Sequence, residues 1–311
     1  MQYVITGAAG FLGFHLATRL LTDGHRVIGL DNFHSGSEAN IAELARHERF
    51  SFRQHDVVDR YDIPCDAVCN LACPASPPHY QRDPVYTARI AFLGTLHALE
   101  NAERHHARML QASTSEIYGD PLVHPQTEDY CGNVDPLSPR ACYDEGKRLG
   151  ETLCADFHRT GRTDGRVARI FNTYGPNMRR DDGRVVTNFI DQALRGEPLT
   201  VYGDGRQTRS FCYVDDLVEG LVRLLAVECN PGPVNLGNPV EVSVRELAEE
   251  VRLQIGADLP IVYEPMPVGD PRRRRPDIGK ARRVLDNWEP KVPLSEGLAR
   301  TIAYFRLSPA R

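Results

Sequence analysis

A tyrosine and a lysine stand four residues apart, at Tyr143 and Lys147. On a helix this spacing places both side chains on one face, one turn apart. A phenol with its ordinary pKa of ~10 is a poor base at neutral pH, but a neighbouring ammonium stabilises the phenolate and lowers that pKa. The pair therefore predicts a base that removes a proton from a substrate hydroxyl.

Hydroxyl side chains precede this pair by about thirty residues, at Ser113, Thr114 and Ser115, where a predicted strand ends. A Tyr-x-x-x-Lys pattern is common by chance, but a Ser/Thr-rich strand end in a dinucleotide-binding fold makes it a strong sign of redox chemistry on a hydroxyl. The alternative interpretation is that Thr114 only caps a turn.

A glycine-rich turn lies near the N-terminus, in residues 6–13. Gly7 permits a tight turn, Gly10 lets the backbone approach a pyrophosphate, and Gly13 lets the following helix pack on the preceding strand. The N-terminus of that helix attracts phosphate charge. Because a strand precedes the motif and a helix follows it, the motif predicts dinucleotide binding rather than an ordinary turn.

Asp31 closes the second predicted strand, about twenty residues after the glycines. A carboxylate there accepts both hydroxyls of an adenosine ribose and repels a 2′-phosphate. The next three residues are Asn32, Phe33 and His34, so no arginine or lysine stands there to bind such a phosphate. The sequence therefore favours NAD over NADP.

The dipeptide Asp56-Val57 ends the third predicted strand, where it either meets the adenine or only terminates the strand. The expected cofactor contacts are Gly7, Gly10, Phe11, Leu12, Gly13, Asp31, Asn32, Phe33, Gly36, Asp56, Val57, Leu71, Ala72, Tyr143 and Lys147.

Short apolar runs alternate with helical stretches through the first half of the chain. We expect strands at residues 2–6, 26–31, 51–56, 66–72, 108–113 and 166–171, and helices at 11–21, 83–106 and 143–160. This alternation is typical of an α/β fold with a Rossmann-type doubly wound parallel sheet.

Prolines become dense beyond residue 171, which predicts a smaller, loop-rich C-terminal lobe that binds substrate. We assign residues 1–171 to the NAD-binding Rossmann domain, with 210–238 returning to it. Residues 172–209 and 239–311 would form the substrate-binding lobe.

The composition, 41% hydrophobic and 25% charged, is ordinary for a globular enzyme. A net charge of −5 gives no electrostatic reason to expect a nucleic-acid partner. No apolar run approaches the ~20 residues of a membrane span, and the chain opens directly on strand-forming residues. We therefore expect a cytoplasmic protein without a membrane partner.

The eight cysteines form no Cys-x-x-Cys pair, and we expect them to be reduced thiols. Cys65, Cys69 and Cys73 have a spacing that suggests a metal site. Because they read as a strand leading into a loop, they cannot converge on one ion, and no metal is expected.

Five segments together resemble the UDP-glucuronate decarboxylases, a family of extended short-chain dehydrogenases/reductases. These segments are residues 70–78, 113–121, 139–147, 169–176 and 208–211, and the similarity runs almost end to end. The resemblance implies tightly held NAD and the small-molecule substrate UDP-glucuronate, bound with its nucleotide in the C-terminal lobe. It also implies a homodimer that pairs through two helices, one of them carrying Tyr143.

The resemblance also implies roles for single residues. The matching catalytic positions are Thr114, Glu116, Tyr143 and Lys147, with Arg274 on the side of the substrate carboxylate. The implied substrate contacts are Arg89, Ser115, Glu116, Asn172, Arg184, Arg209 and Arg274. At Arg89 the chain departs from the family, which usually has a lysine there.

Arg274 belongs to a run of four arginines, residues 272–275, between Pro271 and Pro276. The prolines hold the segment extended, so Arg272 and Arg274 should share one side. A solvated loop is the alternative for the other arginines, and only the resemblance selects Arg274 as the one that reaches the site.

These residues suit oxidation at a sugar C4 by NAD. If C5 carries a carboxylate, the ketone is a β-keto acid and loses carbon dioxide readily, and re-reduction leaves a pentose, here UDP-xylose. Tyr143 and Thr114 would hold the enolate oxygen. Release of the 4-keto pentose before re-reduction is an open alternative.

Two related activities share the cofactor site, nucleotide-sugar 4,6-dehydration and 4-epimerisation. Dehydratases carry Thr-Asp-Glu where this chain has Thr114-Ser115-Glu116, so the acid that protonates a departing 6-hydroxyl is missing. We also expect a 4-epimerase to gain nothing from an arginine directed at C6. A non-catalytic NAD sensor is disfavoured because Thr114, Tyr143 and Lys147 are all intact.

Overall fold

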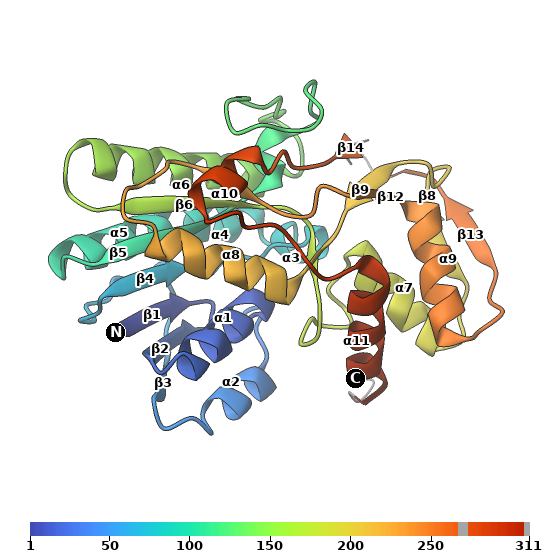
Figure 1. Cartoon of the computed structure of the whole chain (residues 1–311), viewed down its shortest axis with the longest axis horizontal. Helices are drawn as coiled ribbons and strands as arrows, with labels where there is room; N and C mark the ends of the chain where they lie inside the picture. The colour runs from blue at the N-terminus through green and yellow to red at the C-terminus, as the bar shows by residue number, and fades with distance from the viewer. Residues whose placement is uncertain (267–272, 308–311) are drawn as a thin grey trace.

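A parallel sheet of seven strands forms the centre of the computed structural model, which describes residues 1–266 and 273–307 (Figure 1). The strand order is β11-β6-β5-β4-β1-β2-β3. The strands are β1 (Gln2–Thr6), β2 (Arg26–Asp31), β3 (Phe50–Gln54), β4 (Ala67–Asn70), β5 (Arg108–Thr114), β6 (Gly165–Ile170) and β11 (Val234–Leu236). The order reverses between β1 and β4, which is where such sheets open a crevice for a ligand.

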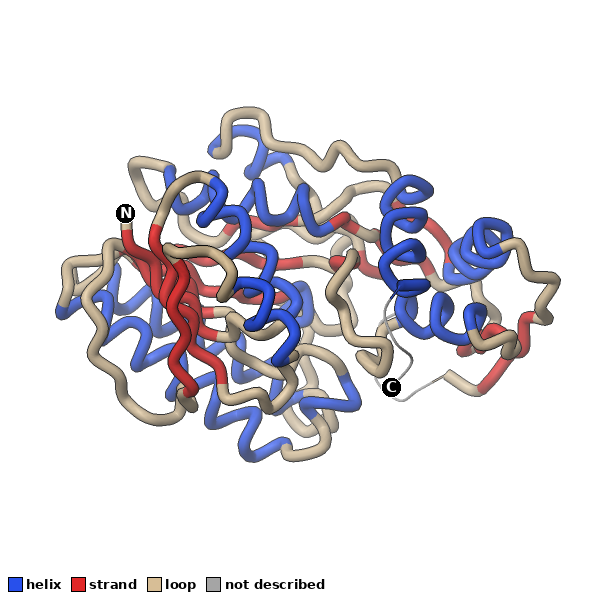
Figure 2. The backbone as a smooth tube through the Cα atoms, turned by 90° about the horizontal axis from the view of Figure 1, so that it is seen from below, coloured by secondary structure: helices blue, strands red, loops and turns tan. Residues whose placement is uncertain are grey.

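Helices cover both faces of this sheet (Figure 2). One face carries α1 (Phe11–Thr22), α2 (Glu38–Leu44) and α8 (Val214–Ala226), and the other carries α4 (Pro84–Arg89), α5 (Thr95–Arg104) and α6 (Ala141–Arg159). Central strands such as β4 are buried along their whole length, as expected for a sheet covered on both sides. The predicted α/β doubly wound fold is confirmed.

Several predicted elements have different bounds; the strand expected at 66–72, for example, spans only Ala67–Asn70. The long helix expected at 83–106 is interrupted by a π-helical turn, η1 (Ile90–Gly94), between α4 and α5. There Gly146 of α6 lies against Ala91, so closely that a Cβ on the glycine would come within 2.7 Å of the alanine Cβ. The third strand ends at Gln54 rather than at residue 56, so Asp56 lies in the following loop.

A second group of elements lies beyond the carboxyl ends of the strands (Figure 1). It contains the helices α7 (Val185–Leu194), α9 (Val244–Ile255) and α11 (Leu294–Leu307) and the parallel pair β8 (Leu199–Tyr202) and β13 (Ile261–Glu264). Helix α9 begins at a capping box between Ser243 and Glu246 and ends at Gly256, whose φ of 76° allows the left-handed turn.

Short strands connect the two groups. Strand β9 (Thr208–Ser210) pairs with β12 (Glu241–Ser243) and with β14 (Arg273–Arg274), so Arg209 and Arg274 are register partners. Strand β7 (Thr173–Tyr174) pairs with β10 (Cys212–Tyr213). Arg273 is exposed and Arg274 is buried, as an extended segment requires, whereas Arg272 lies outside the described residues.

The two groups share buried apolar packing. One cluster extends from Ile5 of β1 and Phe14 of α1, through Leu217 of α8, to Phe189 and Phe305 of the second group. Helix α10 (Gly279–Val284) lies against β11 of the sheet. The domain boundaries drawn from the sequence stay a prediction.

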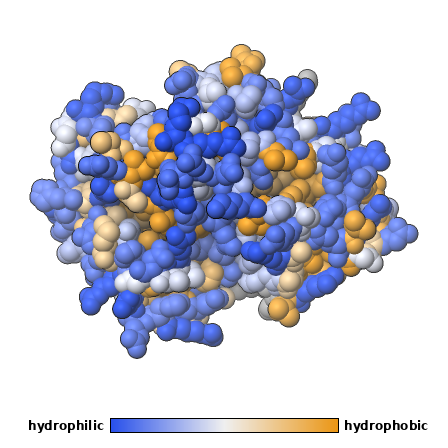
Figure 3. Space-filling model, viewed as in Figure 1, coloured by the Kyte–Doolittle hydropathy of each residue, from blue (hydrophilic) through white to orange (hydrophobic). Residues whose placement is uncertain are grey.

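Hydrophilic residues cover most of the face shown in Figure 3, with apolar residues gathered in smaller areas. Across residues 1–266 and 273–307, no helix has both the length and the apolar character needed to cross a membrane. Over the same ranges, no three His, Cys, Asp or Glu side chains gather as a metal site would require.

Candidate active site

The glycine turn forms the floor of a narrow cavity at the carboxyl end of β1. Gly7 has a φ of 74°, and a Cβ on it would lie 2.8 Å from the Ala72 nitrogen. A Cβ on Gly13 would lie 2.0 Å from the Gly7 oxygen, so only glycine allows α1 to pack this closely on the turn. Gly10 is the N-cap of α1 and brings no side chain over the first-turn amides. These amides are free to bind a pyrophosphate.

Predicted contact residues surround this cavity. Its lining includes Gly7, Gly10, Asp31, Asn32, Gly36, Asp56, Val57, Leu71 and Ala72. Three other predicted contacts, Phe11, Gly13 and Phe33, are not among the described lining residues; Gly13 serves packing instead. A cradle of small residues with a carboxylate at one end fits a dinucleotide such as NAD.

Asp31 is held rigidly at the end of β2. Its carboxylate accepts hydrogen bonds from the backbone N–H groups of Ala9, at 3.0 Å, and Phe33, at 2.7 Å. Burial nevertheless raises the pKa of Asp31 above its usual range. The carboxylate oxygens retain lone pairs that could accept ribose hydroxyls.

Asp56 belongs to a polar group in the lining of the same cavity. It accepts hydrogen bonds from the Tyr86 hydroxyl at 2.5 Å and from the Asn32 amide at 3.1 Å. Burial opposes ionisation, but these bonds and the Val58 N–H hold the pKa of Asp56 below its usual value. Asp56 therefore lines the cavity and does not simply end the strand.

A larger cavity of about 670 Å³ adjoins the first, and Leu71 and Cys73 line both. Its lining draws on the ends of β5 and β6, on α6, and on the second group of elements. The predicted residues that line it are Leu12, Leu71, Thr114, Ser115, Glu116, Tyr143, Lys147, Asn172, Arg184, Arg209 and Arg274. One continuous site therefore has room for a dinucleotide and a second ligand.

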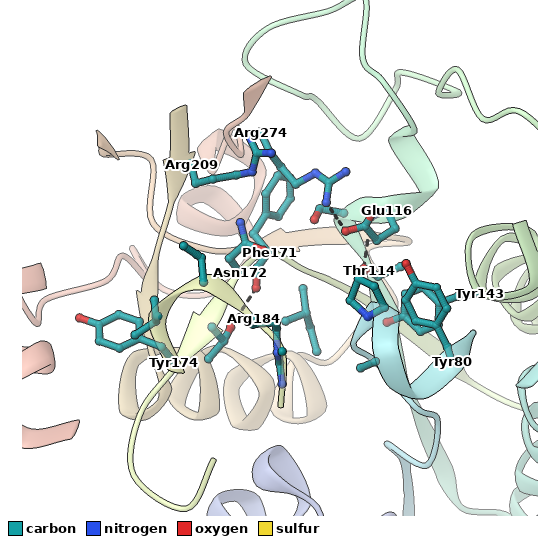
Figure 4. Close-up of a pocket in the computed structure, with 18 of the residues that line it drawn as sticks. Tyr80, Thr114, Glu116, Tyr143, Phe171, Asn172, Tyr174, Arg184, Arg209 and Arg274 are labelled. Carbon is teal, nitrogen blue, oxygen red and sulfur yellow. Dashed lines mark hydrogen bonds and ion pairs between the residues drawn. The ribbon is translucent and has the colours of Figure 1, made fainter. Parts of the chain in front are cut away.

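Tyr143 and Thr114 face each other in this cavity (Figure 4). The Thr114 side chain hydrogen-bonds the phenol of Tyr143, and its Oγ1 also accepts from the Glu116 N–H at 3.2 Å. The Tyr143 ring stacks on Tyr80, with centroids 5.1 Å apart and planes inclined by 6°. The Lys147 Nζ lies 5.7 Å from the Tyr143 ring centroid, as the helical spacing predicts.

The sequence predicted that the Lys147 ammonium lowers the pKa of the Tyr143 phenol, and this is wrong for the protein alone. Burial raises the pKa of Tyr143, which is only 5% exposed, well above its ordinary value. The Lys147 ammonium donates instead to the Ala112 carbonyl at 2.8 Å. The sequence spacing of Tyr143 and Lys147 predicts their relative position. It does not reveal how much free energy is needed to desolvate a buried phenolate.

Glu116 lies between two arginines. It pairs with Arg140 at 2.6 Å and with Arg274, which lies on β14. Burial alone would raise the pKa of Glu116, but the two guanidinium groups outweigh burial and lower it to about 2. Glu116 is therefore a carboxylate at neutral pH.

Arg274 keeps two donors free for a ligand. It is 3% exposed and lines the cavity, and only its Nη1 contacts Glu116. Within the described part of the chain, its Nε and Nη2 have no hydrogen-bond partner. These two atoms form the fork that binds a carboxylate through parallel hydrogen bonds.

Arg89 is a predicted substrate contact that the structure does not bring to the site. It is the last residue of α4, it is exposed, and the described cavity lining does not include it. Arg184 does line the cavity, with its guanidinium held by Asp182 at 2.5 Å. Figure 4 shows Arg184 and Asn172 across the cavity from Tyr143.

Sequence reasoning missed three residues that shape the cavity: Cys73, Tyr80 and Arg140. Tyr80 and Arg140 stand within or beside two of the segments that carry the family resemblance, but no spacing rule links them to Tyr143 or Glu116. Their role depends on tertiary packing, since Tyr80 comes from α3 (Pro77–Tyr80), an element distant in sequence from α6.

Comparison with known proteins agrees with this geometry. The model of the NAD dependent epimerase/dehydratase family matches residues 3–237. Two proteins named UDP-glucuronic acid decarboxylase, number 6 of Arabidopsis thaliana and number 1 of Xenopus tropicalis, are each 52% identical to this chain. The matches cover 99% and 98% of this chain and 89% and 72% of those proteins.

Solved structures are similar over nearly the whole chain. The UDP-glucose 4-epimerase of Thermotoga maritima with UDP-glucose has a TM-score of 0.89 at 31% identity, covering 98% of this chain and 99% of that one. The UDP-glucuronic acid 4-epimerase of Bacillus cereus, in complex with UDP-glucuronic acid and NAD, has a TM-score of 0.88 at 30% identity with the same coverage. The chain thus belongs to the NAD dependent epimerase/dehydratase family and, within it, to the UDP-glucuronic acid decarboxylases.

Proposed function

We propose that this protein is an NAD-dependent enzyme that decarboxylates UDP-glucuronate to UDP-xylose. The observation that carries the proposal is Arg274, whose free Nε and Nη2 lie in the same cavity as Tyr143 and Thr114. A carboxylate held there by the fork is brought near the groups that act on a neighbouring hydroxyl. The names of the relatives support the same substrate.

NAD, when bound, supplies the acceptor for the C4 hydride and later the donor that returns it. Tyr143 takes the proton from the 4-hydroxyl when it is in its phenolate form, and the Thr114 hydroxyl holds the same oxygen by a hydrogen bond. Because burial keeps the phenol protonated in the protein alone, the positive charges of Lys147 and of bound NAD would have to favour that form. Lys147, which the Ala112 carbonyl orients, adds a positive charge on the same helix face. The burial that raises the pKa of Tyr143 also makes its proton transfer sensitive to nearby charge.

The 4-ketone with a carboxylate on C5 is a β-keto acid. The C5–C6 bond breaks, its electron pair forms a C4–C5 double bond, and the ketone oxygen takes the negative charge as carbon dioxide leaves. Tyr143, now carrying the proton, and Thr114 donate hydrogen bonds to that enolate oxygen. Arg274 fixes the plane of the carboxylate so that the breaking bond overlaps the carbonyl π-system. A proton from solvent then adds to C5, and return of the hydride to C4 and of the Tyr143 proton to the C4 oxygen gives the pentose.

We expect the purified enzyme to consume UDP-glucuronate with little lasting rise in nicotinamide absorbance, because one hydride is removed and returned within each cycle. Product mass and NMR, followed together with the absorbance, check this. UDP-xylose is the expected product. NADH that accumulates in proportion to substrate means release of the 4-keto pentose, which is the alternative outcome for the same site.

The same experiment separates decarboxylation from 4-epimerisation. An arginine near C6 does not by itself exclude an epimerase, because a UDP-glucuronic acid 4-epimerase, whose substrate carries a carboxylate, is among the similar structures. A product that keeps its carboxylate and differs only at C4 would identify this chain as an epimerase. Dehydration stays disfavoured because Ser115 occupies the position of the dehydratase acid.

We also propose that the chain forms a homodimer through α4 and α6. Three large apolar side chains are exposed on this part of the surface: Val85 is 70% exposed, Phe92 37% and Leu149 43%. Exposed apolar residues on adjoining helices are typical of an interface. Leu149→Glu should therefore convert a dimer to a monomer in sedimentation velocity. Leu253→Glu, at an exposed position of α9 away from these helices, should leave the dimer unchanged. The cytoplasmic location expected from the sequence stays a prediction.

A further inference from the structure

Four charged side chains form a compact group at the catalytic end of the cavity, and three of them line it. This charge cluster consists of Glu116, Arg140, Asp144 and Arg274. Glu116 pairs with both arginines, as described above. Asp144 follows Tyr143 on α6 and is 4% exposed, but the mechanism proposed above does not use it.

Asp144 is buried without a full set of partners. In the described part of the chain, its Oδ1 has no hydrogen-bond partner. The charges that act on it are those of Glu116, Arg140, Arg274 and, on its own helix, Glu145. The titratable groups of Tyr80 and Cys142 also interact with it. Both arginines that could neutralise Asp144 are already paired with Glu116.

The charge of the cluster depends on whether a substrate carboxylate is present. With Asp144 ionised, two carboxylates balance two guanidinium groups. A sugar carboxylate bound at Arg274 then adds a negative charge to a buried site that already holds the ionised Glu116 and Asp144, which is unfavourable. Protonation of Asp144 removes one of these negative charges while the sugar carboxylate is bound.

We propose that Asp144 takes up a proton when the carboxylate of a nucleotide-linked sugar acid binds at Arg274. The inference rests on the proposed function, because it requires that carboxylate. Asp144 acts through Glu116 and the arginines and is therefore a positioning residue. Protonating it keeps Arg274 available for the ligand, since the guanidinium no longer has two protein carboxylates to neutralise.

Burial, reinforced by the charge of Glu116, raises the pKa of Asp144 to about 7. Below pH 7 Asp144 is therefore mostly protonated before the ligand arrives. Above pH 7 it is ionised in the free enzyme, so binding must be accompanied by proton uptake. The affinity for UDP-glucuronate should then fall about tenfold for each pH unit above pH ~7. The affinity for UDP-glucose, which has no carboxylate, should not change.

Isothermal titration calorimetry of the NAD-loaded enzyme tests this directly. UDP-glucuronate is titrated at pH 8 in two buffers with different ionisation enthalpies, so that the difference in heat gives the number of protons taken up. A Tyr143→Phe background prevents turnover during the measurement, and UDP-glucose is titrated in parallel. We expect an uptake close to one proton for UDP-glucuronate and close to none for UDP-glucose.

Asp144→Asn in the same background should abolish the uptake and make the affinity for UDP-glucuronate independent of pH between 6 and 8. Glu145→Gln is the matched control, because it neutralises an adjacent carboxyl on α6 that lies closer to solvent and pairs with Arg148. It should retain the uptake. If the role of Asp144 were purely structural, Asp144→Asn would lower the affinity for both UDP-sugars alike and would leave the pH dependence of UDP-glucuronate binding in place.

The outcomes separate this inference from the proposed function. If the enzyme binds UDP-glucuronate without taking up a proton at pH 8, Asp144 does not compensate the charge, and no variant is needed to reach that conclusion. Uptake that persists in Asp144→Asn assigns the proton to another group and also overturns the inference. If UDP-glucose binds and UDP-glucuronate does not, the proposed function itself is wrong.

Discussion

Replacing Tyr143 with phenylalanine should lower kcat for UDP-glucuronate by about a thousandfold, because a positioned proton acceptor contributes roughly 10²–10⁴ to the rate. The substitution removes one hydroxyl and its bond to Thr114, while the ring can still stack on Tyr80 at the observed 5.1 Å. Steady-state kinetics measures the loss, and titration with NAD should give nearly the same dissociation constant as the parent protein.

Tyr61→Phe is a suitable control for this substitution. The Tyr61 hydroxyl is also buried, without a hydrogen-bond partner in the described residues, but it lies outside the cavity lining. Its loss should leave kcat unchanged. Activity near the parent level in Tyr143→Phe would remove Tyr143 from the mechanism.

Arg274→Ala should lose both affinity for UDP-glucuronate and turnover, by at least a hundredfold in kcat/KM, because truncating a buried, charge-assisted contact costs about 3 kcal/mol or more. Arg274→Lys should keep part of the affinity but lose much of the rate. A lysine supplies charge without the planar fork formed by Nε and Nη2. Arg273→Ala removes the exposed neighbour on β14 and should have little effect.

UDP-glucose provides the decisive comparison for Arg274. It has the same nucleotide but no carboxylate, so its dissociation constant should be nearly indifferent to Arg274→Ala. An equal loss of affinity for both sugars would mean that Arg274 contacts the diphosphate or supports the packing of β14 and β9. In that case the carboxylate assignment would be wrong.

The fold was predictable because its signals are local in sequence. Strands such as β1 and β2 are short apolar runs. The spacing of Gly7, Gly10 and Gly13 predicts the turn between the first strand and the first helix. The predicted ends of elements were wrong where tertiary contacts determine them. The π-helical turn at Ile90–Gly94, for example, lies where Gly146 closely approaches Ala91. No periodicity in residues 83–106 encodes that approach.

The candidate site was predictable to a different degree. Tyr143 and Lys147 share a helix face, so spacing alone brought them together. Glu116 and Arg274 are 158 positions apart, and only the family resemblance connected them before the structure did. Arg89 was carried over in the same way, but it lies on the surface. Burial was the quantity least accessible from sequence, which is why the expected direction of the Tyr143 pKa was wrong.

The placement of Arg274 on a two-residue strand late in the chain has a consequence for synthesis. The lining of the first cavity is complete at Ile90, whereas β14 begins at Arg273. Since a protein leaves the ribosome from its N-terminus, the stretch that we propose binds NAD in the first cavity emerges long before Arg274, the proposed carboxylate ligand. A chain terminated before residue 273 would contain every described lining residue of the first cavity and lack Arg274.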